Sequence, residues 1–207
     1  MDATLKPAWE TLCSRYSADT ALVTQLWEEL EQAYTSKGRY YHTLDHLAYM
    51  LQLAEEHKPN ARRNDLLRFA IFYHDIVYSS TRSDNEEKSA AIAEKHLARL
   101  GLGSADIAFV KEMILATKVH QQQSDDTLNL LLDLDLAILG ADDEKYEAYS
   151  QAVRQEYGLY PDIIYKPGRR KVLQHFLDQP NIYKTSIFKQ KYEAKARLNL
   201  QRELKRL

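Results

Sequence analysis

The sequence predicts an all-α protein, a helical bundle formed by a single domain, and three observations predict it. The 207 residues include only six glycines and five prolines, less than half of the average usage of about 12% for the pair. Sandwiches and barrels of many short strands need more turn residues than this. Apolar residues recur three and four positions apart along most of the chain, as on one face of a helix. Hydrophobic residues make up 44% and charged residues 28% of the chain, which is typical of a globular domain with a sizeable core.

In the first half of the chain, helices are expected where apolar residues step by three and four, over 22–33, 44–54 and 90–100. The third of these follows the pattern Ser83-Asp84-Asn85-Glu86, which is typical of a capping box at a helix start. Gly101 is expected to end the same helix, because glycine readily adopts the left-handed conformation found after a last helical turn.

In the second half, apolar stripes predict helices over 107–114, 128–139, 146–157 and 196–207. Ser104 is expected to cap the first of them. The second is apolar nearly all round, which is typical of a buried helix, and Gly140 is expected to end it. The stretch 158–168 contains two glycines and two prolines, and we expect it to be irregular and to border a substrate pocket.

Several classes of protein are excluded by patterns that the chain lacks. Neither GxGxxG nor GxxxxGKS or GxxxxGKT occurs, so nucleotide binding by a glycine-rich loop is not expected. The net charge of −2 gives no support for broad binding of nucleic acids or membrane surfaces. Cys13 is the single cysteine, which excludes a disulfide framework and a thiolate metal site. Because the first residues lack a signal-peptide pattern and no apolar run approaches ~18 residues, we expect a cytoplasmic protein without a membrane partner.

Two ionisable residues follow one another in the apolar segment 67–78, LRFAIFYHDIVY. His74 continues the apolar face of this segment, and Asp75 comes next. Burial of both without partners would cost several kcal/mol, and a cation that binds both would remove this cost. The alternative, which is the commoner case for such a segment alone, is a core histidine hydrogen-bonded to a backbone carbonyl.

Further histidines and aspartates suggest a metal site. His42 and His46 lie four residues apart, so a helix would place both on one face, although such pairs are also common on solvated surfaces. Asp135 is expected to be buried, because its helical neighbours three and four positions away are all apolar. Asp133 lies on a more mixed face and is expected to support a ligand or the fold. Imidazole and carboxylate donors together suit Zn²⁺, Mn²⁺, Fe²⁺, Co²⁺ or Ni²⁺ more than Ca²⁺.

This set of residues resembles the H…HD…D signature of the HD superfamily of metal-dependent phosphohydrolases. The likeness is closest to a family of small bacterial HD-superfamily proteins, and it covers the chain from about Arg39 to Leu207. It is carried by the segments YYHTLDHL, FYHDIVY, DNEEKSA, LDLDLAILGA and IYKTSIF…EAKARLNLQREL. The resemblance implies one all-α domain of the HD type over 1–207, with a core at about 20–160 and a C-terminal helical extension over 161–207.

The resemblance also implies a ligand set, formed by His46, His74, Asp75 and Asp135. These residues would bind one or two divalent ions per chain, drawn from Mn, Co, Ni, Zn, Fe and Mg, and Asp75 would also serve catalysis. The segment YHTLDH is similar to the YHNxxH motif of cyclic-nucleotide phosphodiesterases, with Thr43 in place of Asn. Carried over, that motif makes His42 the general acid; the alternative is that His42 is itself a ligand.

Other polar residues are candidates for supporting roles. Glu86 is expected to orient a water at the metal, with helix capping as an equal alternative. A second metal or a phosphate would be bound by Asn85, Lys118 and His120, and the substrate by Arg39, Tyr165 and Arg169. For each of these six residues an ordinary loop, ion-pair or packing role is the alternative.

The sequence thus predicts a metal-dependent phosphohydrolase, a phosphomonoesterase or phosphodiesterase, that acts through a metal-activated water. A small phosphorylated substrate, above all a nucleotide, is the expected partner, and a homodimer is left open. Two alternatives remain: an HD module that binds a nucleotide or partner without turnover, and a di-iron oxygenase. The oxygenase would need further histidine ligands, for which only His120 and His42 are available.

Overall fold

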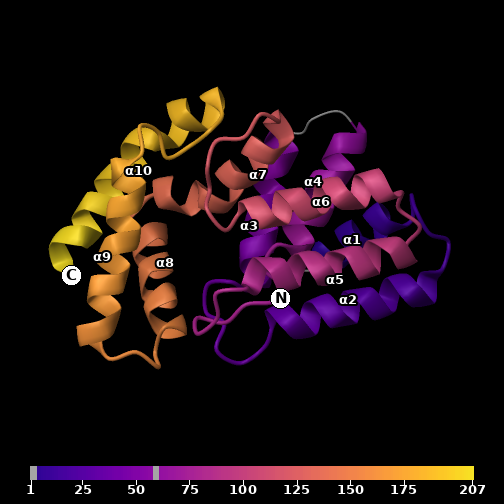
Figure 1. Cartoon of the computed structure of the whole chain (residues 1–207), viewed down its shortest axis with the longest axis horizontal. Helices are drawn as coiled ribbons and strands as arrows, with labels where there is room; N and C mark the ends of the chain where they lie inside the picture. Colours follow the sequence, from indigo (N-terminus) through magenta and orange to yellow (C-terminus); the bar gives the residue numbers. More distant parts are fainter. Residues whose placement is uncertain (1–3, 58–60) are drawn as a thin grey trace. The chain divides into compact units, whose positions relative to one another are not determined.

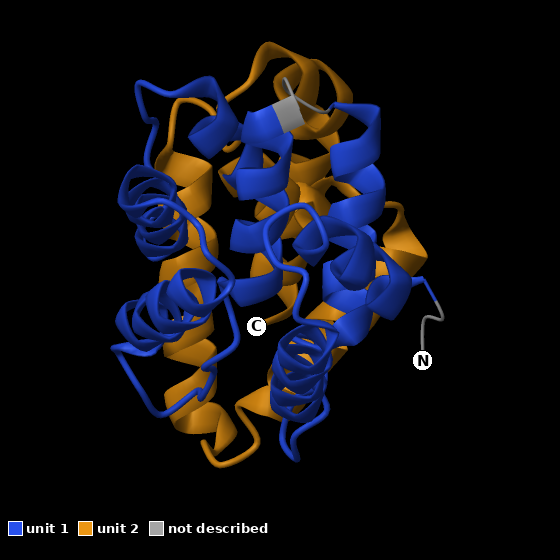
Figure 2. Ribbon diagram, turned by 90° about the vertical axis from the view of Figure 1, so that its right-hand side faces the viewer, with its two compact units in different colours: residues 1–131 blue, residues 132–207 orange. Residues whose placement is uncertain are grey.

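The computed structural model describes residues 4–57 and 61–207, and within these ranges the chain forms ten α-helices, one 3-10 helix and no strand (Figure 1). The all-α fold class is therefore confirmed. Two compact units are present, residues 1–131 and 132–207, and the division between them falls inside helix α7 (Figure 2). One domain over 1–207, with its core at about 20–160, stays a prediction. The expected absence of a signal peptide also stays a prediction, and residues 1–3 of the segment on which it depends lie outside the described ranges.

Unit 1 contains the following helices: α1 (Leu5–Cys13), α2 (Thr20–Tyr34), α3 (Leu44–Glu56), α4 (Ala61–Tyr73), α5 (Asn85–Arg99), α6 (Ser104–Ala116) and the start of α7 (Asp126–Leu136). Helix α4 packs against α3, α5 and α6, while α1 packs against α2 and α3. Trp9 of α1 is fully buried, and its ring makes edge contacts with Phe69 and Phe72 of α4. Its Nε1 donates a hydrogen bond to the carbonyl of Val23 at 3.0 Å. Large aromatic side chains therefore join α1, α2 and α4 in one core.

The helices expected over 22–33, 44–54, 90–100 and 107–114 are all present. Gly101 ends α5 with a φ of +88°, and the N–H groups of Gly101 and Leu102 bond to the last turn of the helix, as in a Schellman motif. The capping box is absent, because Asp84 rather than Ser83 precedes α5 and its carboxylate is paired with Arg82. Ser104 is the first helical residue of α6, and Gly103 takes the capping position.

Unit 2 contains the end of α7, the 3-10 helix η1 (Ala137–Gly140), α8 (Asp143–Glu156), α9 (Asp162–Asp178) and α10 (Ser186–Arg206). Helices α9 and η1 pack against α10, and α8 packs against η1. A Cβ atom at Gly140 would lie 2.6 Å from the Cβ of Tyr192 and 2.9 Å from its carbonyl oxygen. Only glycine allows η1 and α10 to approach this closely.

The expectation of an irregular stretch over 158–168 is wrong for its second half. Helix α9 begins at Asp162 and continues through Pro167 and Gly168. Proline has the φ of a helix but cannot donate a hydrogen bond to the carbonyl four residues earlier. That carbonyl belongs to Ile163, which is 83% exposed, so water can replace the missing donor.

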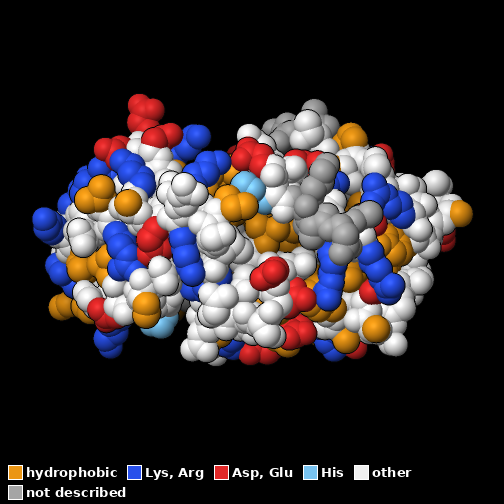
Figure 3. Space-filling model, turned by 90° about the horizontal axis from the view of Figure 1, so that it is seen from above, with side chains coloured by type: hydrophobic (Ala, Val, Ile, Leu, Met, Phe, Trp, Pro, Cys, Tyr) orange, Lys and Arg blue, Asp and Glu red, His pale blue; other side chains and the backbone are white. Residues whose placement is uncertain are grey.

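The surface of the chain carries both signs of charge. On the face shown in Figure 3, Lys and Arg side chains are interspersed with Asp and Glu side chains. Among the described residues, no helix is both long and apolar enough to cross a bilayer.

Candidate metal centre

His74 and Asp75 follow directly after α4, which ends at Tyr73. The N–H of His74 still bonds to the carbonyl of Ala70 at 2.9 Å, so the helical path continues to this residue. The Nδ1 atom of His74 lies 2.9 Å from the carbonyl oxygen of Ile71. Since a carbonyl can only accept, Nδ1 carries the proton and Nε2 carries the lone pair. The bond to a backbone carbonyl that we considered as an alternative is thus present, and it prepares the other nitrogen to bind a metal.

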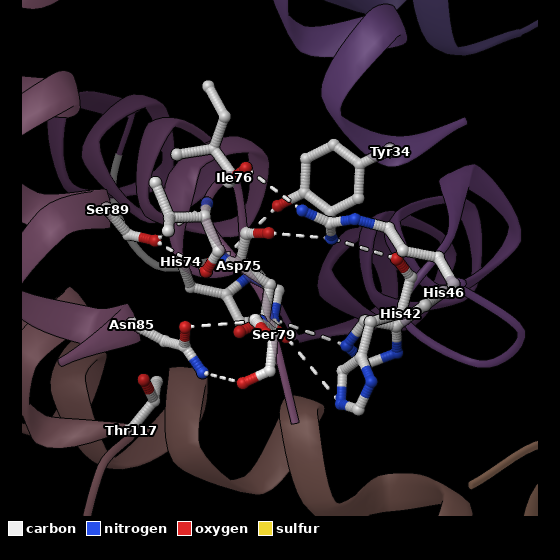
Figure 4. A network of polar contacts seen from close by, with 12 residues as sticks. Tyr34, His42, His46, His74, Asp75, Ile76, Ser79, Asn85, Ser89 and Thr117 are labelled. Carbon is white, nitrogen blue, oxygen red and sulfur yellow. Dashed lines mark hydrogen bonds and ion pairs between the residues drawn. The ribbon is translucent and has the colours of Figure 1, made fainter. Parts of the chain in front are cut away.

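The side chains of His46, His74 and Asp75 converge on one point (Figure 4). The two Nε2 atoms of His46 and His74 are 3.3 Å apart, and Oδ2 of Asp75 lies 3.2 Å from Nε2 of His74. One donor atom from each residue lies within 4.8 Å of the others. Ligands at ~2.0–2.1 Å from a tetrahedral ion are separated by roughly 3.3–3.4 Å, so the spacing of these donors fits a divalent cation. His46 and His74 are 4% and 1% exposed, and Asp75 is half-buried.

His42 lies at the edge of this cluster. It precedes α3, so it does not share a helical face with His46 as the spacing suggested. Its ring is stacked on that of Tyr78, with centroids 4.0 Å apart, and its Nε2 lies 3.8 Å from Oδ2 of Asp75. The side chain is 21% exposed, so it is both near the donors and open to solvent.

The main chain at Asp75 is held by Tyr34 of α2. The hydroxyl of Tyr34 accepts a hydrogen bond from the N–H of Asp75 at 3.2 Å and donates one to the carbonyl of Phe72 at 3.1 Å (Figure 4). Tyr34 is 1% exposed. We did not predict a role for it, because in the sequence it appears as one more apolar position on its helix.

Helix α5 holds the segment that follows. Ser89 Oγ accepts a bond from the N–H of Val77 and donates to its carbonyl, at 3.1 and 3.3 Å. Asn85 makes the same pair of bonds with the backbone of Ser79, at 3.0 and 3.2 Å. Asn85 was predicted to bind a second metal or phosphate; in the structure its amide group is engaged with this loop.

Arg39 was predicted to bind substrate. In the structure its guanidinium group donates hydrogen bonds to the carbonyls of His42, Asp75 and Ile76 at 2.8–3.0 Å. A contact with substrate stays a prediction, whereas the contact with the main chain around the donors is observed.

The remaining unit 1 candidates lie on or near α5 and α6. Glu86 is the second residue of α5 and is half-buried. Lys118 pairs with Glu87 and donates a bond to the carbonyl of Ser83 at 2.7 Å. This pairing raises the pKa of Lys118 and lowers the pKa of Glu87. His120 lies in the loop after α6 with a φ of +49°, and its role, like that of Glu86, stays a prediction.

The expected burial of Asp135 rather than Asp133 is wrong. Asp133 is fully buried, and its two oxygens accept hydrogen bonds from the N–H groups of Lys184 and Thr185 and from the Thr185 hydroxyl, at 2.6–2.7 Å. Burial raises the pKa of Asp133 above its usual value, although these hydrogen bonds oppose the rise. Asp135 is half-buried. It belongs to unit 2, and its role as a ligand stays a prediction.

Arg169 and Tyr165 lie inside unit 2. Arg169 is 8% exposed, and its Nε and Nη2 atoms donate to the two oxygens of Glu203 at 2.7 and 3.0 Å. Burial alone would raise the pKa of Glu203, but Arg169 together with hydrogen bonds from Tyr146 and Ser150 holds this pKa below its usual value. Tyr165 is buried, with the guanidinium of Arg154 4.5 Å from its ring centroid. Ion-pair and packing contacts are observed for both residues, and the substrate-binding roles of Arg169 and Tyr165 stay predictions.

The geometry can be compared with known families and structures. A family model described as HD domain matches residues 39–153, which is more than half of the chain and includes His42, His46, His74, Asp75 and Asp135. Searches among curated proteins and among solved structures found no match. HD domains bind divalent metal ions, and the matched segment contains the cluster of two buried histidines and a half-buried aspartate. The resemblance drawn from the sequence is confirmed: the chain belongs to the HD domain family, whose members are commonly metal-dependent phosphohydrolases.

Proposed function

We propose that the protein is a metal-dependent phosphohydrolase that acts on a small phosphate ester, with a nucleotide as the expected substrate. The observation that carries the proposal is the convergence of His46, His74 and Asp75: His74 Nε2 lies 3.3 Å from His46 Nε2 and 3.2 Å from Asp75 Oδ2, and one donor atom from each residue lies within 4.8 Å of the others. These atoms lie in the segment matched by the HD domain. We also propose a cytoplasmic setting for the enzyme.

The three donors suit a divalent ion of the Mn, Fe, Co, Ni, Zn group, or Mg, at one or two ions per chain. When bound, such an ion would supply an activated water at neutral pH and neutralise charge on the phosphate. His74 is held by Ile71 in the tautomer that offers Nε2. Asp75 supplies the carboxylate, and its main chain is held by Tyr34 and Arg39.

His42 is our candidate for the general acid. Its imidazole is stacked on Tyr78 beside the donors and remains partly exposed, so a substrate could reach it. Transfer of the proton from Nε2 to the leaving oxygen would neutralise the charge that develops there as the ester bond breaks. If His42 were instead a ligand, this group would be engaged with the ion and another acid would be needed.

Metal analysis of the purified protein tests the site. We expect one or two divalent ions per chain in the wild type and almost none in His74→Ala or Asp75→Ala. His175→Ala is the matched control, because His175 is exposed on α9 and should leave the metal content unchanged. Unchanged metal content in both His74→Ala and Asp75→Ala would contradict the proposed site.

A substrate screen tests the activity. Nucleotides and phosphorylated metabolites would be incubated with the protein and Mn²⁺, Co²⁺, Ni²⁺ or Mg²⁺, and the hydrolysis products measured, since a phosphodiester yields a monoester rather than free phosphate. Hydrolysis that is lost in Asp135→Ala would support a role of Asp135 as a further ligand. Absence of hydrolysis of every substrate would favour a binding module, and iron-dependent oxygen uptake would favour an oxygenase.

A further inference from the structure

Arg39 connects two segments of unit 1 that are far apart in the sequence. It lies in the loop between α2 and α3, while Asp75 and Ile76 lie just after α4. Its Nη1 donates to the carbonyl of His42 at 3.0 Å and to that of Asp75 at 2.8 Å, and its Nη2 donates to the carbonyl of Ile76 at 3.0 Å. One guanidinium therefore ties the loop of the candidate acid to the loop of a candidate metal ligand.

These bonds are made to carbonyl groups that follow the end of a helix. Asp75 and Ile76 lie beyond the last turn of α4, where the regular hydrogen bonds of the helix no longer continue. Bonds from a charged donor are shorter and stronger than neutral ones. The planar fork of arginine can reach three acceptors at once, which the single ammonium of lysine cannot do in the same geometry.

Two tyrosines flank the guanidinium group of Arg39, and they connect it to His42 and Asp75. The Cζ atom of Arg39 lies 4.8 Å from the ring centroid of Tyr34 and 5.6 Å from that of Tyr78. Tyr34 also bonds to the main chain of Asp75, and Tyr78 stacks on the ring of His42. The contacts of Arg39 thus reach both His42 and Asp75 through the backbone and through aromatic neighbours.

We propose that Arg39 is a positioning residue that sets His42 relative to Asp75. By holding their main chains together, it fixes the 3.8 Å separation of His42 Nε2 from Asp75 Oδ2. The consequence for catalysis rests on the proposed function, but the geometry itself can be tested in the protein without metal or substrate.

Arg197 in unit 2 provides a matched control. Its Nη1 donates to the carbonyl of Leu177 at 3.0 Å, and its Nη2 donates to those of Gln179 and Pro180 at 2.7 and 3.1 Å. Like Arg39, it holds three backbone carbonyls, but none of them belongs to unit 1. Arg197→Ala should therefore remove a comparable set of bonds without a specific effect on His42.

The first test is the NMR signal of the His42 ring in the metal-free protein. In Arg39→Ala we expect the ring-proton shifts of His42 to move toward those of an unstacked histidine, because its stacking on Tyr78 loosens. Arg39→Lys, which retains the charge, should move the His42 shifts in the same direction. It replaces Arg39→Ala in this measurement if the alanine variant does not fold. Arg197→Ala should leave the shifts in place. Unchanged His42 shifts in the Arg39 variants would overturn the proposal.

The second test is calorimetric titration with Mn²⁺ alone. We expect Arg39→Ala to bind Mn²⁺ about tenfold more weakly, as is typical when support of a metal ligand is lost. Added methylguanidine should restore part of this affinity in Arg39→Ala and have no such effect in Arg197→Ala. An arginine that only binds substrate would leave both the His42 signal and Mn²⁺ affinity unchanged, which would overturn the proposal. If the wild type binds neither Mn²⁺ nor any of the other divalent ions named above, the proposed function fails, and the His42 signal still decides the role of Arg39.

Discussion

The hydroxyl of Tyr73 lies 3.3 Å from Nδ1 of His96, and Nε2 of the same imidazole lies 3.2 Å from a carboxylate oxygen of Glu29. Since Glu29 accepts the proton on Nε2, Nδ1 accepts the hydrogen of Tyr73. His96 is 4% exposed, and burial lowers its pKa below the usual 6.5, although Glu29 opposes the shift. The neutral, buried His96 of α5 thus connects Glu29 of α2 with Tyr73 of α4. Tyr73 directly precedes His74 in the sequence.

The free energy of unfolding should fall as the pH drops below about 6.5. In the unfolded chain His96 takes up a proton near its usual pKa of 6.5, whereas in the folded protein it does so only at lower pH. The contribution to stability is complete above pH 6.5 and is lost as the pH falls toward the folded pKa, with a slope of up to about 1.4 kcal/mol per pH unit. Urea denaturation between pH 5 and 8 measures this dependence.

In His96→Gln, which removes the titrating group, we expect a flatter pH dependence. His175→Gln retains His96 and should retain the wild-type curve. If His96→Gln follows the wild-type curve as well, another group is responsible.

His46 and His42 should behave differently when each is replaced. Mn²⁺ at 100 times its dissociation constant should stabilise the wild type by about 2.7 kcal/mol, and His46→Ala should lose most of this gain because a donor is missing. His42→Gln should retain the gain but lower kcat by about 10²–10⁴-fold, as expected for removal of a general acid. Thermal unfolding with and without Mn²⁺, together with phosphate release, gives both quantities. Loss of the Mn²⁺ effect in His42→Gln would make His42 a ligand instead.

Asp133 and Asp135 form a second contrasting pair. Asp133→Ala should lower the free energy of unfolding by about 3 kcal/mol, because the buried N–H of Lys184 and the partly buried N–H of Thr185 lose their acceptor. Asp135→Ala should have less than half of this effect on stability, and as a predicted ligand it should lower the metal content. Chemical denaturation and metal analysis of both variants distinguish these roles. Equal losses of stability would show that the half-buried Asp135 also supports the fold.

Substitution of glycine by alanine should have opposite signs at two positions in unit 2. Gly140→Ala places a methyl group against Tyr192 and should destabilise the protein by about 2 kcal/mol. Gly168→Ala lies inside α9 with nothing within 4 Å, and should stabilise it by about 0.5–1 kcal/mol through better helix propensity. Thermal melts of both variants provide the comparison. A stabilised Gly140→Ala would mean that η1 can move away from α10 at little cost.

The helices that could be predicted are those whose buried residues follow the helical period. Leu26 and Leu30 of α2 are fully buried, and so they mark their helix in the sequence. Helix α9 was missed in part because Pro167 and Gly168 usually interrupt helices, and nothing local shows that Ile163, four residues before the proline, is exposed. Helix α1 was also missed, since a helix of nine residues carries too few apolar positions to establish a period.

The candidate donors could be predicted because their chemistry is unusual for their surroundings: His74 and Asp75 interrupt an apolar run. The residues that hold these donors in place could not be predicted from the sequence. Arg39 reaches Asp75 across 36 positions and Tyr34 reaches it across 41, so no local pattern connects them. The error over Asp133 has the same cause, because the residues that cover it, Lys184 and Thr185, lie about 50 positions away.

Arg39 and Arg197 show how a chain with few glycines and prolines gives its loops a fixed shape. Glycine and proline shape a loop through the conformations that their backbone allows, and this effect is permanent. The hydrogen bonds of an arginine that donates to three carbonyls can instead be broken by rotation of one side chain. Release of such an arginine would loosen its loop while the helices stay folded. In hydrogen exchange, we would then expect the amides next to these loops to exchange by local opening, at rates that depend on the arginine and the loop's other contacts rather than on the stability of the whole protein.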